Sequence, residues 1–128
     1  MNRKSMRSPL ARAIGLGSTK SGIEHWWAQR ISAVALVPLT LWFVASIIAH
    51  TASDYAGFMA WLRKPYVTVL MIALLIALFY HLALGLRVII EDYRHSWTKF
   101  AGTIAAQLGC SALMIAGIIA TLRIAFGT

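Results

Sequence analysis

The chain has 128 residues, of which 59% are hydrophobic and only 12% are charged. A soluble domain carries about twice that charged fraction, so the composition argues against a water-soluble globular protein. The formal net charge of +8 is distributed around apolar stretches, which favours a role in membrane orientation over a nucleic-acid-binding surface.

The first thirty residues are basic, with a single acid, Glu24. Their longest apolar stretch is too short for a signal peptide. A mitochondrial transit peptide is similarly basic, but the chain keeps Met1, so we expect a retained segment and a bacterial inner membrane rather than a mitochondrial one. We therefore divide the chain into a basic inner-face segment, 1–30, and a membrane anchor, 31–128.

Three long uncharged apolar runs follow, of 19, 21 and 22 residues, and His81 interrupts the second. Each is long enough to cross a hydrocarbon core of about 30 Å as a helix. The sequence predicts an all-α integral membrane bundle of three helices, with a modest kink at Pro38 in the first. The spans expected on this basis are 31–50, 66–90 and 101–123.

Lys and Arg set the expected orientation. Six precede the first span, whereas only Arg63 and Lys64 lie between the first and the second. We expect the N-terminus and the 91–100 connection inside, and the 50–65 loop and the C-terminus outside. Aromatic residues typical of membrane interfaces flank the spans, with Trp26, Trp27 and Trp97 inside and Tyr55, Trp61 and Tyr66 outside.

Small residues in the third span indicate packing. Cys110 has no partner for an intrachain disulfide and is expected to be a small packing residue. Gly102, Gly109 and Gly117 allow a neighbouring helix to approach closely. None of these residues selects a function.

His81 has two explanations from the residues alone. An intramembrane histidine can make an interhelical hydrogen bond, or its neutral imidazole can be an axial ligand of haem iron. Gly85 follows on nearly the same face, where a glycine lets a flat macrocycle approach the helix, and this favours haem. The other histidines are displaced along the membrane normal, so a second axial histidine would come from another polypeptide.

Asp92 and Tyr93 lie near the inner end of the same helix. Eleven residues separate Asp92 from His81, which places the two about 20° apart around the helix and roughly 16 Å apart along it. The pair is compatible with an ordinary charged helix end and an interfacial tyrosine. It is also suited to a quinone head group, because a phenol can donate to a carbonyl while a carboxylate orients the phenol or relays protons.

Arg30 begins the first span at the same inner level. Such an arginine ordinarily extends towards lipid phosphate, and it can also pair with a haem propionate. Arg87 points about 120° away from His81, so contact with propionate, lipid or a partner chain is open for it.

The run 81–93, HLALGLRVIIEDY, resembles the second membrane helix of the small cytochrome b anchor subunit of succinate dehydrogenase. The stretch 22–33, GIEHWWAQRISA, resembles that family's start of the first helix. The resemblance, together with the three-span layout, covers most of residues 20–126.

This resemblance implies a membrane anchor of succinate:ubiquinone oxidoreductase, respiratory complex II of the tricarboxylic acid cycle and the respiratory chain. The chain itself would carry no catalytic residue. FAD and the iron–sulfur clusters would reside in a flavoprotein and an iron–sulfur protein, and a b-type haem would be shared with the large cytochrome b anchor subunit. The implied roles are haem iron ligand for His81, propionate contact for Arg30, ubiquinone donor for Tyr93 and supporting acid for Asp92.

Two alternatives stay open. A fumarate reductase anchor would run the reaction in the opposite direction, which depends on the potentials of all the centres. A cofactor-free structural or transporter-accessory membrane protein would explain the apolar spans and aromatic belts equally well, but it leaves the register of His81 with Asp92 and Tyr93 to coincidence.

Overall fold

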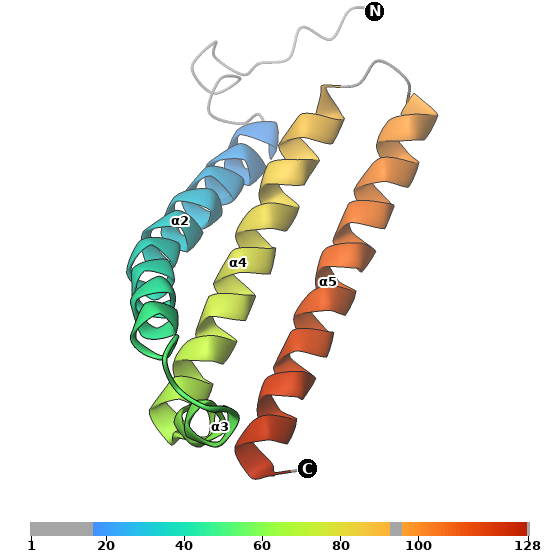
Figure 1. Ribbon diagram of the computed structural model, residues 1–128. Coiled ribbons are helices and arrows are strands. Elements are labelled where there is room, and N and C mark those ends of the chain that lie inside the picture. The colour runs from blue at the N-terminus through green and yellow to red at the C-terminus, as the bar shows by residue number, and fades with distance from the viewer. Residues whose placement is uncertain (1–16, 93–95, 128) are drawn as a thin grey trace, which may run out of the picture.

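The computed structural model describes residues 17–92 and 96–127, with side chains from residue 23 onward (Figure 1). Within these ranges the chain is helical and contains no strand. Three long helices run antiparallel in sequence order, and a short fourth helix lies in the connection between the first two (Figure 1). The helices are α2 (Gly17–Ala49), α3 (Tyr55–Leu62), α4 (Pro65–Glu91) and α5 (Ser96–Phe126).

The three long helices meet the length and composition needed to cross a membrane, over Ile23–Ala49, Pro65–Glu91 and Ser96–Phe126. The all-α, three-span prediction is therefore confirmed. Each helix is longer than the predicted span, because uncharged runs identify only the part that hydrocarbon surrounds. Helical structure continues through residues such as Arg30 and Lys99, whose charged ends can reach the interface.

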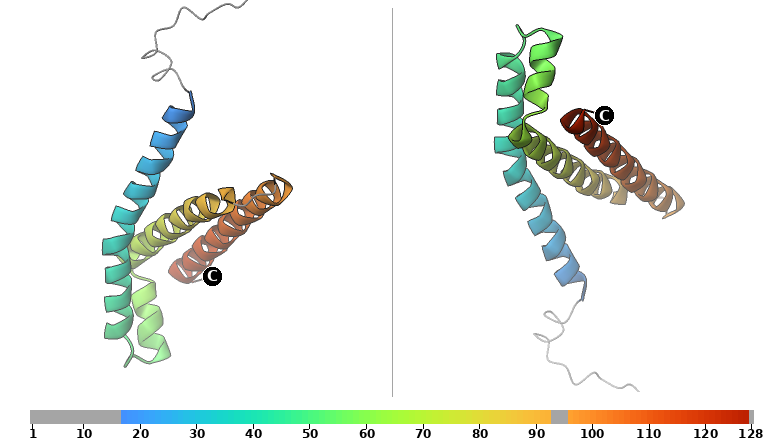
Figure 2. Two further views of the ribbon diagram at one scale, coloured as in Figure 1. Left: turned by 90° about the horizontal axis from the view of Figure 1, so that it is seen from above. Right: turned by 90° about the horizontal axis from the view of Figure 1, so that it is seen from below.

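Helix α4 occupies the centre of the fold and packs against both α2 and α5. Figure 2 shows α4 and α5 lying side by side with closely aligned axes, whereas α2 is splayed away from this pair. Pro38 lies inside α2, which curves along its length (Figure 1). A proline removes one helical hydrogen bond and is the expected cause of such a bend.

Glycines bring α5 close to α4. A Cβ atom placed on Gly117 would lie 3.1 Å from Cδ2 of Leu75, and one on Gly102 would lie 3.3 Å from Cγ2 of Ile90. Gly109 has open space around it, so two of the three glycines predicted to permit close helix contact do so. Cys110 is free and buried, as expected of a packing residue.

Helix α3 was not anticipated from the sequence. The Asp54 carboxylate caps it by accepting a hydrogen bond from the Gly57 amide at 2.8 Å. The helix then places Trp61, only 4% exposed, against Trp42 and His50, with the His50 and Trp61 rings stacked 4.6 Å apart. Trp61 is thus a buried packing residue rather than the interfacial anchor predicted from its position.

Most other apolar side chains face outward. Val34, Leu41 and Leu108 are each about two-thirds exposed or more, and other large apolar side chains of the three spans, such as Leu82 and Ile104, are about two-fifths exposed. In a membrane helix these side chains contact lipid or a partner helix, since acyl chains solvate them as well as a protein core does. The few buried positions therefore matter more here than in a soluble domain of equal size.

Candidate functional site

His81 lies on α4 and faces α2. Its Nδ1 atom is 3.0 Å from the hydroxyl oxygen of Ser32, which α2 supplies. The imidazole is half-buried between the two helices. The histidine is therefore turned towards the protein rather than towards acyl chains.

Ser32 is 5% exposed and is the buried polar residue among those described. Its hydroxyl also donates to the carbonyl oxygen of Gln29 at 3.0 Å, one turn back along α2. Serine commonly makes this local bond inside a helix. An interhelical bond of this kind contributes on average about 0.6 kcal/mol in membrane proteins, so it orients the imidazole more than it holds the helices together.

Gly85, one helical turn beyond His81, leaves open space at the surface of α4. A Cβ atom added there would have a single neighbour within 4 Å, the Nε2 atom of Gln29, and that one at 4.0 Å. The lack of a side chain keeps the surface of α4 flat next to His81. The approach of a planar group at this position stays a prediction from the sequence.

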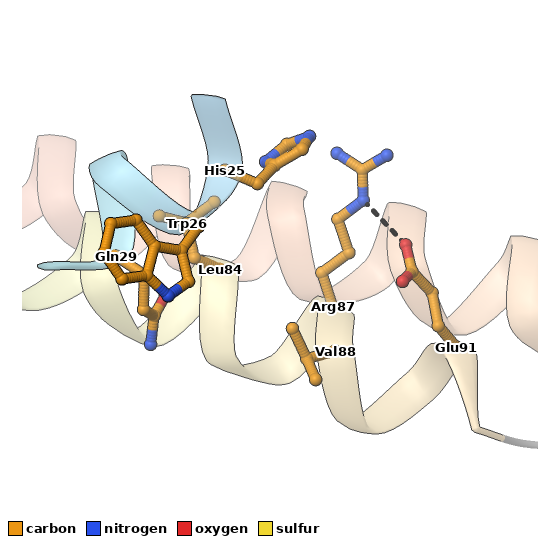
Figure 3. Close-up of a pocket in the computed structure, with 7 residues that line it drawn as sticks. All are labelled: His25, Trp26, Gln29, Leu84, Arg87, Val88 and Glu91. Atoms are coloured by element: carbon orange, nitrogen blue, oxygen red, sulfur yellow. Dashed lines mark hydrogen bonds and ion pairs between the residues drawn. The ribbon is translucent and has the colours of Figure 1, made fainter. Parts of the chain in front are cut away.

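A pocket of about 290 Å³ opens between α2 and α4, with Gln29, the residue nearest to Gly85, in its wall (Figure 3). His81 does not line this pocket. It combines apolar and aromatic walls with imidazole, amide, guanidinium and carboxylate groups. Apolar walls with a few polar groups are typical of a small-molecule or cofactor site. The lining residues are His25, Trp26, Gln29, Leu84, Arg87, Val88 and Glu91.

Arg87 contributes the cation of this pocket. Its Nε atom lies 3.2 Å from the Glu91 carboxylate in an i,i+4 ion pair, drawn as a dashed line in Figure 3. Arg30, predicted to contact a propionate, does not line the pocket. Its guanidinium carbon lies 4.9 Å from the centroid of the Trp26 ring, as in a cation–π contact.

Asp92 is exposed and caps the end of α4, where its amide bonds to the Ile89 and Ile90 carbonyls. Tyr93, the predicted quinone donor, lies outside the described residues. The described residues therefore end one position before Tyr93. The role of the Tyr93 phenol stays a prediction from the sequence.

The structure places two further histidines at opposite ends of α2. His25 lines the pocket, about two helical turns from Ser32. His50 bonds through Nδ1 to the Ser46 carbonyl at 2.8 Å and stacks on Trp61. Neither contacts His81, His95 lies outside the described residues, and within residues 17–92 and 96–127 no three metal-ligating side chains come together.

Sequence reasoning missed the α2 side of this site. Gln29 and Ser32 follow His25 at the i+4 and i+7 positions, so the three share one helix face. Leu84, Val88 and Glu91 share the His81 face of α4 in the same way. The spacing indicates which residues share a face on each helix, but it does not show that these two faces pack against each other.

Comparison with known proteins identifies the family. Residues 4–122 match the family described as Succinate dehydrogenase/Fumarate reductase transmembrane subunit. The chain is similar to the succinate dehydrogenase hydrophobic membrane anchor subunit of Rickettsia conorii, with 32% identity over 117 residues covering 89% of this chain and 92% of the relative. No solved structure matches the chain significantly.

Two further relatives carry the same name. The protein of Rickettsia bellii is 35% identical over 116 residues, covering 89% of this chain and 92% of the relative. That of Paracoccus denitrificans is 29% identical over 120 residues, covering 94% and 93% respectively. The three apolar helices and these near full-length matches lead to one conclusion. The chain is a multi-pass membrane protein and belongs to the succinate dehydrogenase/fumarate reductase transmembrane subunit family.

Proposed function

We propose that this chain anchors a succinate:ubiquinone oxidoreductase, shares a b-type haem with a large anchor protein and forms part of the ubiquinone-reduction site. The observation that carries the proposal is the imidazole of His81. It is held between α2 and α4 through one nitrogen, Nδ1, bonded to Ser32. Within the described residues its Nε2 atom makes no hydrogen bond, so it is free to bind a metal.

The residues around His81 fit a haem. Haem ligation requires only one histidine from this chain, because the porphyrin and a partner protein would supply the other ligands of the iron. Gly85 leaves a flat surface next to the ring, and the adjoining pocket offers apolar walls from Leu84 and Val88 with Arg87 at its polar side. A bound haem would supply a one-electron carrier, while these side chains would position it and exclude water.

A partner protein follows from the same chemistry. The described histidines other than His81 lie at the ends of α2, where His50 is engaged with Ser46 and Trp61. A second axial histidine would therefore come from the large cytochrome b anchor. The exposed apolar faces of α2 and α5 provide surface for that partner and for lipid.

The quinone site would lie where α4 ends. Asp92 is exposed there, and Tyr93 follows it in the chain. The phenol of Tyr93 would donate to a ubiquinone carbonyl as charge develops, and the Asp92 carboxylate would orient the phenol or pass on a proton. An exposed position beside the end of a membrane helix is accessible to a lipid-tailed quinone.

The proposed setting is a bacterial inner membrane, with residues 1–30 and the end of α4 on the cytoplasmic side. The excess of Lys and Arg before α2 supports this orientation. The flavoprotein and the iron–sulfur protein would dock on the same side, next to Asp92 and Tyr93. Succinate oxidation is favoured over fumarate reduction because the relatives are named for succinate dehydrogenase.

Haem ligation is tested by replacing two histidines in the intact complex. His81→Leu should abolish or strongly alter the reduced b-type haem spectrum, because it removes the ligand nitrogen. The comparison change His50→Phe keeps an aromatic ring beside Trp61 and should leave the spectrum in place, since His50 follows the far end of α2. Equal spectra in the wild-type and His81→Leu complexes would contradict ligation by His81 and favour a purely interhelical hydrogen bond.

The quinone site is tested by Tyr93→Phe, which removes only the hydroxyl. Ubiquinone reduction should fall by about a hundredfold or more, the typical contribution of a positioned general acid. Succinate oxidation with a soluble dye should persist, because the flavin site is in another polypeptide. Equal loss of ubiquinone reduction and of dye-linked succinate oxidation would indicate failed assembly instead.

The partner proteins are tested by mass spectrometry of the solubilised complex, which should identify a flavoprotein and an iron–sulfur protein.

A further inference from the structure

Ser32 is the least expected polar residue in the described part of the chain. It lies two residues after Arg30, near the start of the apolar part of α2, is 5% exposed, and contacts both α2 and α4 through one oxygen atom. Burying a hydroxyl is unfavourable unless its hydrogen bonds are satisfied. Both bonds are made here, and one of them ends on the side chain proposed to bind iron.

The two bonds determine where the protons lie. A serine hydroxyl has one proton to donate and lone pairs to accept. The Gln29 carbonyl oxygen can only accept, so the Ser32 proton points to it. The oxygen of Ser32 must then accept the second bond, which requires a proton on Nδ1 of His81. In the neutral ring the lone pair is consequently on Nε2.

We propose that Ser32 is a positioning residue for His81: its hydroxyl fixes the Nδ1–H tautomer and the plane of the imidazole, so that Nε2 is the nitrogen presented to iron. The inference rests on the proposed haem ligation. Metal-binding histidines ordinarily donate their second N–H to an oxygen, which sets the ring orientation and makes the imidazole a stronger donor. Here the oxygen comes from a neighbouring helix, so the α2–α4 contact is coupled to the ligand.

This role predicts an effect on the haem that a purely structural bond would not have. Without an acceptor for Nδ1–H, the imidazole becomes a weaker donor and stabilises ferric iron less. The midpoint potential of the haem in Ser32→Ala should therefore rise. A tenfold loss in the preference for the ferric over the ferrous state corresponds to a rise of about 59 mV. The ferric electron paramagnetic resonance signal should also shift, because the ring plane is no longer fixed.

The experiment compares variants in the assembled complex by redox titration and by resonance spectra of the ferric haem. Ser32→Thr keeps the hydroxyl and should remain close to the wild type. Thr121→Val is the matched control, because the Thr121 hydroxyl donates only to the Gly117 carbonyl of its own helix, at 2.8 Å. It removes a part-buried membrane hydroxyl without touching His81 and should leave both readouts unchanged.

Each outcome decides the proposal. A higher potential and an altered resonance signal in Ser32→Ala alone would support it. Wild-type readouts in Ser32→Ala, or an equal shift in Thr121→Val, would overturn it. If Ser32→Ala fails to assemble, Ser32→Cys replaces the hydroxyl by a weak acceptor of similar size, and the same two readouts apply. A normal haem in His81→Leu would refute ligation itself, a separate result.

Discussion

The two ends of the helix bundle are built differently. At the α3 end, where α2 ends and α4 begins, Trp61 is buried against Trp42, His50 and Phe58. At the pocket end, where α2 begins and α4 ends, polar and charged side chains line a pocket between the same two helices. The side chains at the α3 end pack against one another, whereas the pocket end leaves polar groups available to a ligand or a partner.

This difference suggests a division of labour along the membrane normal. The aromatic cluster joins α2 to α3, in the connection between the first two spans. Val67, completely buried in the first turns of α4, belongs to the same end. Ser32 and His81 lie further along the helices, towards the pocket. A rigid α3 end would thus set the helix register on which the Ser32–His81 contact depends.

The largest effect is expected from Trp61→Ala. Removing a buried aromatic side chain costs about 3–5 kcal/mol, so the variant should unfold at lower denaturant concentration or fail to assemble. The measurement is a detergent-based unfolding titration followed by tryptophan fluorescence or by complex yield. Trp97→Ala is the control, because Trp97 is 77% exposed and should tolerate the change. Equal losses in the two variants would remove the distinction between the cluster and an ordinary interfacial tryptophan.

Gly117→Val should have a smaller effect on the same measurement. A Cβ atom at Gly117 would approach both methyl carbons of Leu75, at 3.1 and 3.2 Å, so the end of the Leu75 side chain would have to shift by a few tenths of an ångström. Overpacking of this kind costs typically about 1–3 kcal/mol. Gly109→Val is the control, since nothing lies within 4 Å of the added Cβ. If Gly117→Val were as stable as Gly109→Val, the α4–α5 interface would be looser than the structure indicates.

The sequence predicts some of these features and not others, for physical reasons. Membrane spans require long uncharged runs, so the number and type of the helices followed from composition alone. Helix α3 did not, because eight residues in a short connection give no periodic signal, although Asp54 is a typical N-cap residue. Burial of Trp61 depends on contacts with a separate helix, and no local pattern reports it.

The candidate site divides in the same way. His81 stands out because an imidazole is rare in an apolar helix, and Gly85 follows from its spacing. Ser32 and Gln29 do not stand out, since α2 is apolar around most of its circumference and its pattern does not reveal the face that meets α4. Arg87 lines the pocket and Arg30 contacts Trp26, and neither position can be read from the sequence, because each depends on how α2 and α4 pack together.

The smallest effect is expected from the ion pair at the pocket end. Arg87 and Glu91 are 40% and 60% exposed, and surface pairs of this type contribute about 0–1 kcal/mol. Arg87→Gln and Glu91→Gln should therefore change the unfolding titration little, singly or together. A double-mutant cycle in low-salt and high-salt detergent buffer measures the coupling directly. A coupling of several kcal/mol would mean that the pocket end is held by its charges, and the contrast with the α3 end would fail. Little coupling would leave Arg87 free to serve a bound anionic group rather than the fold.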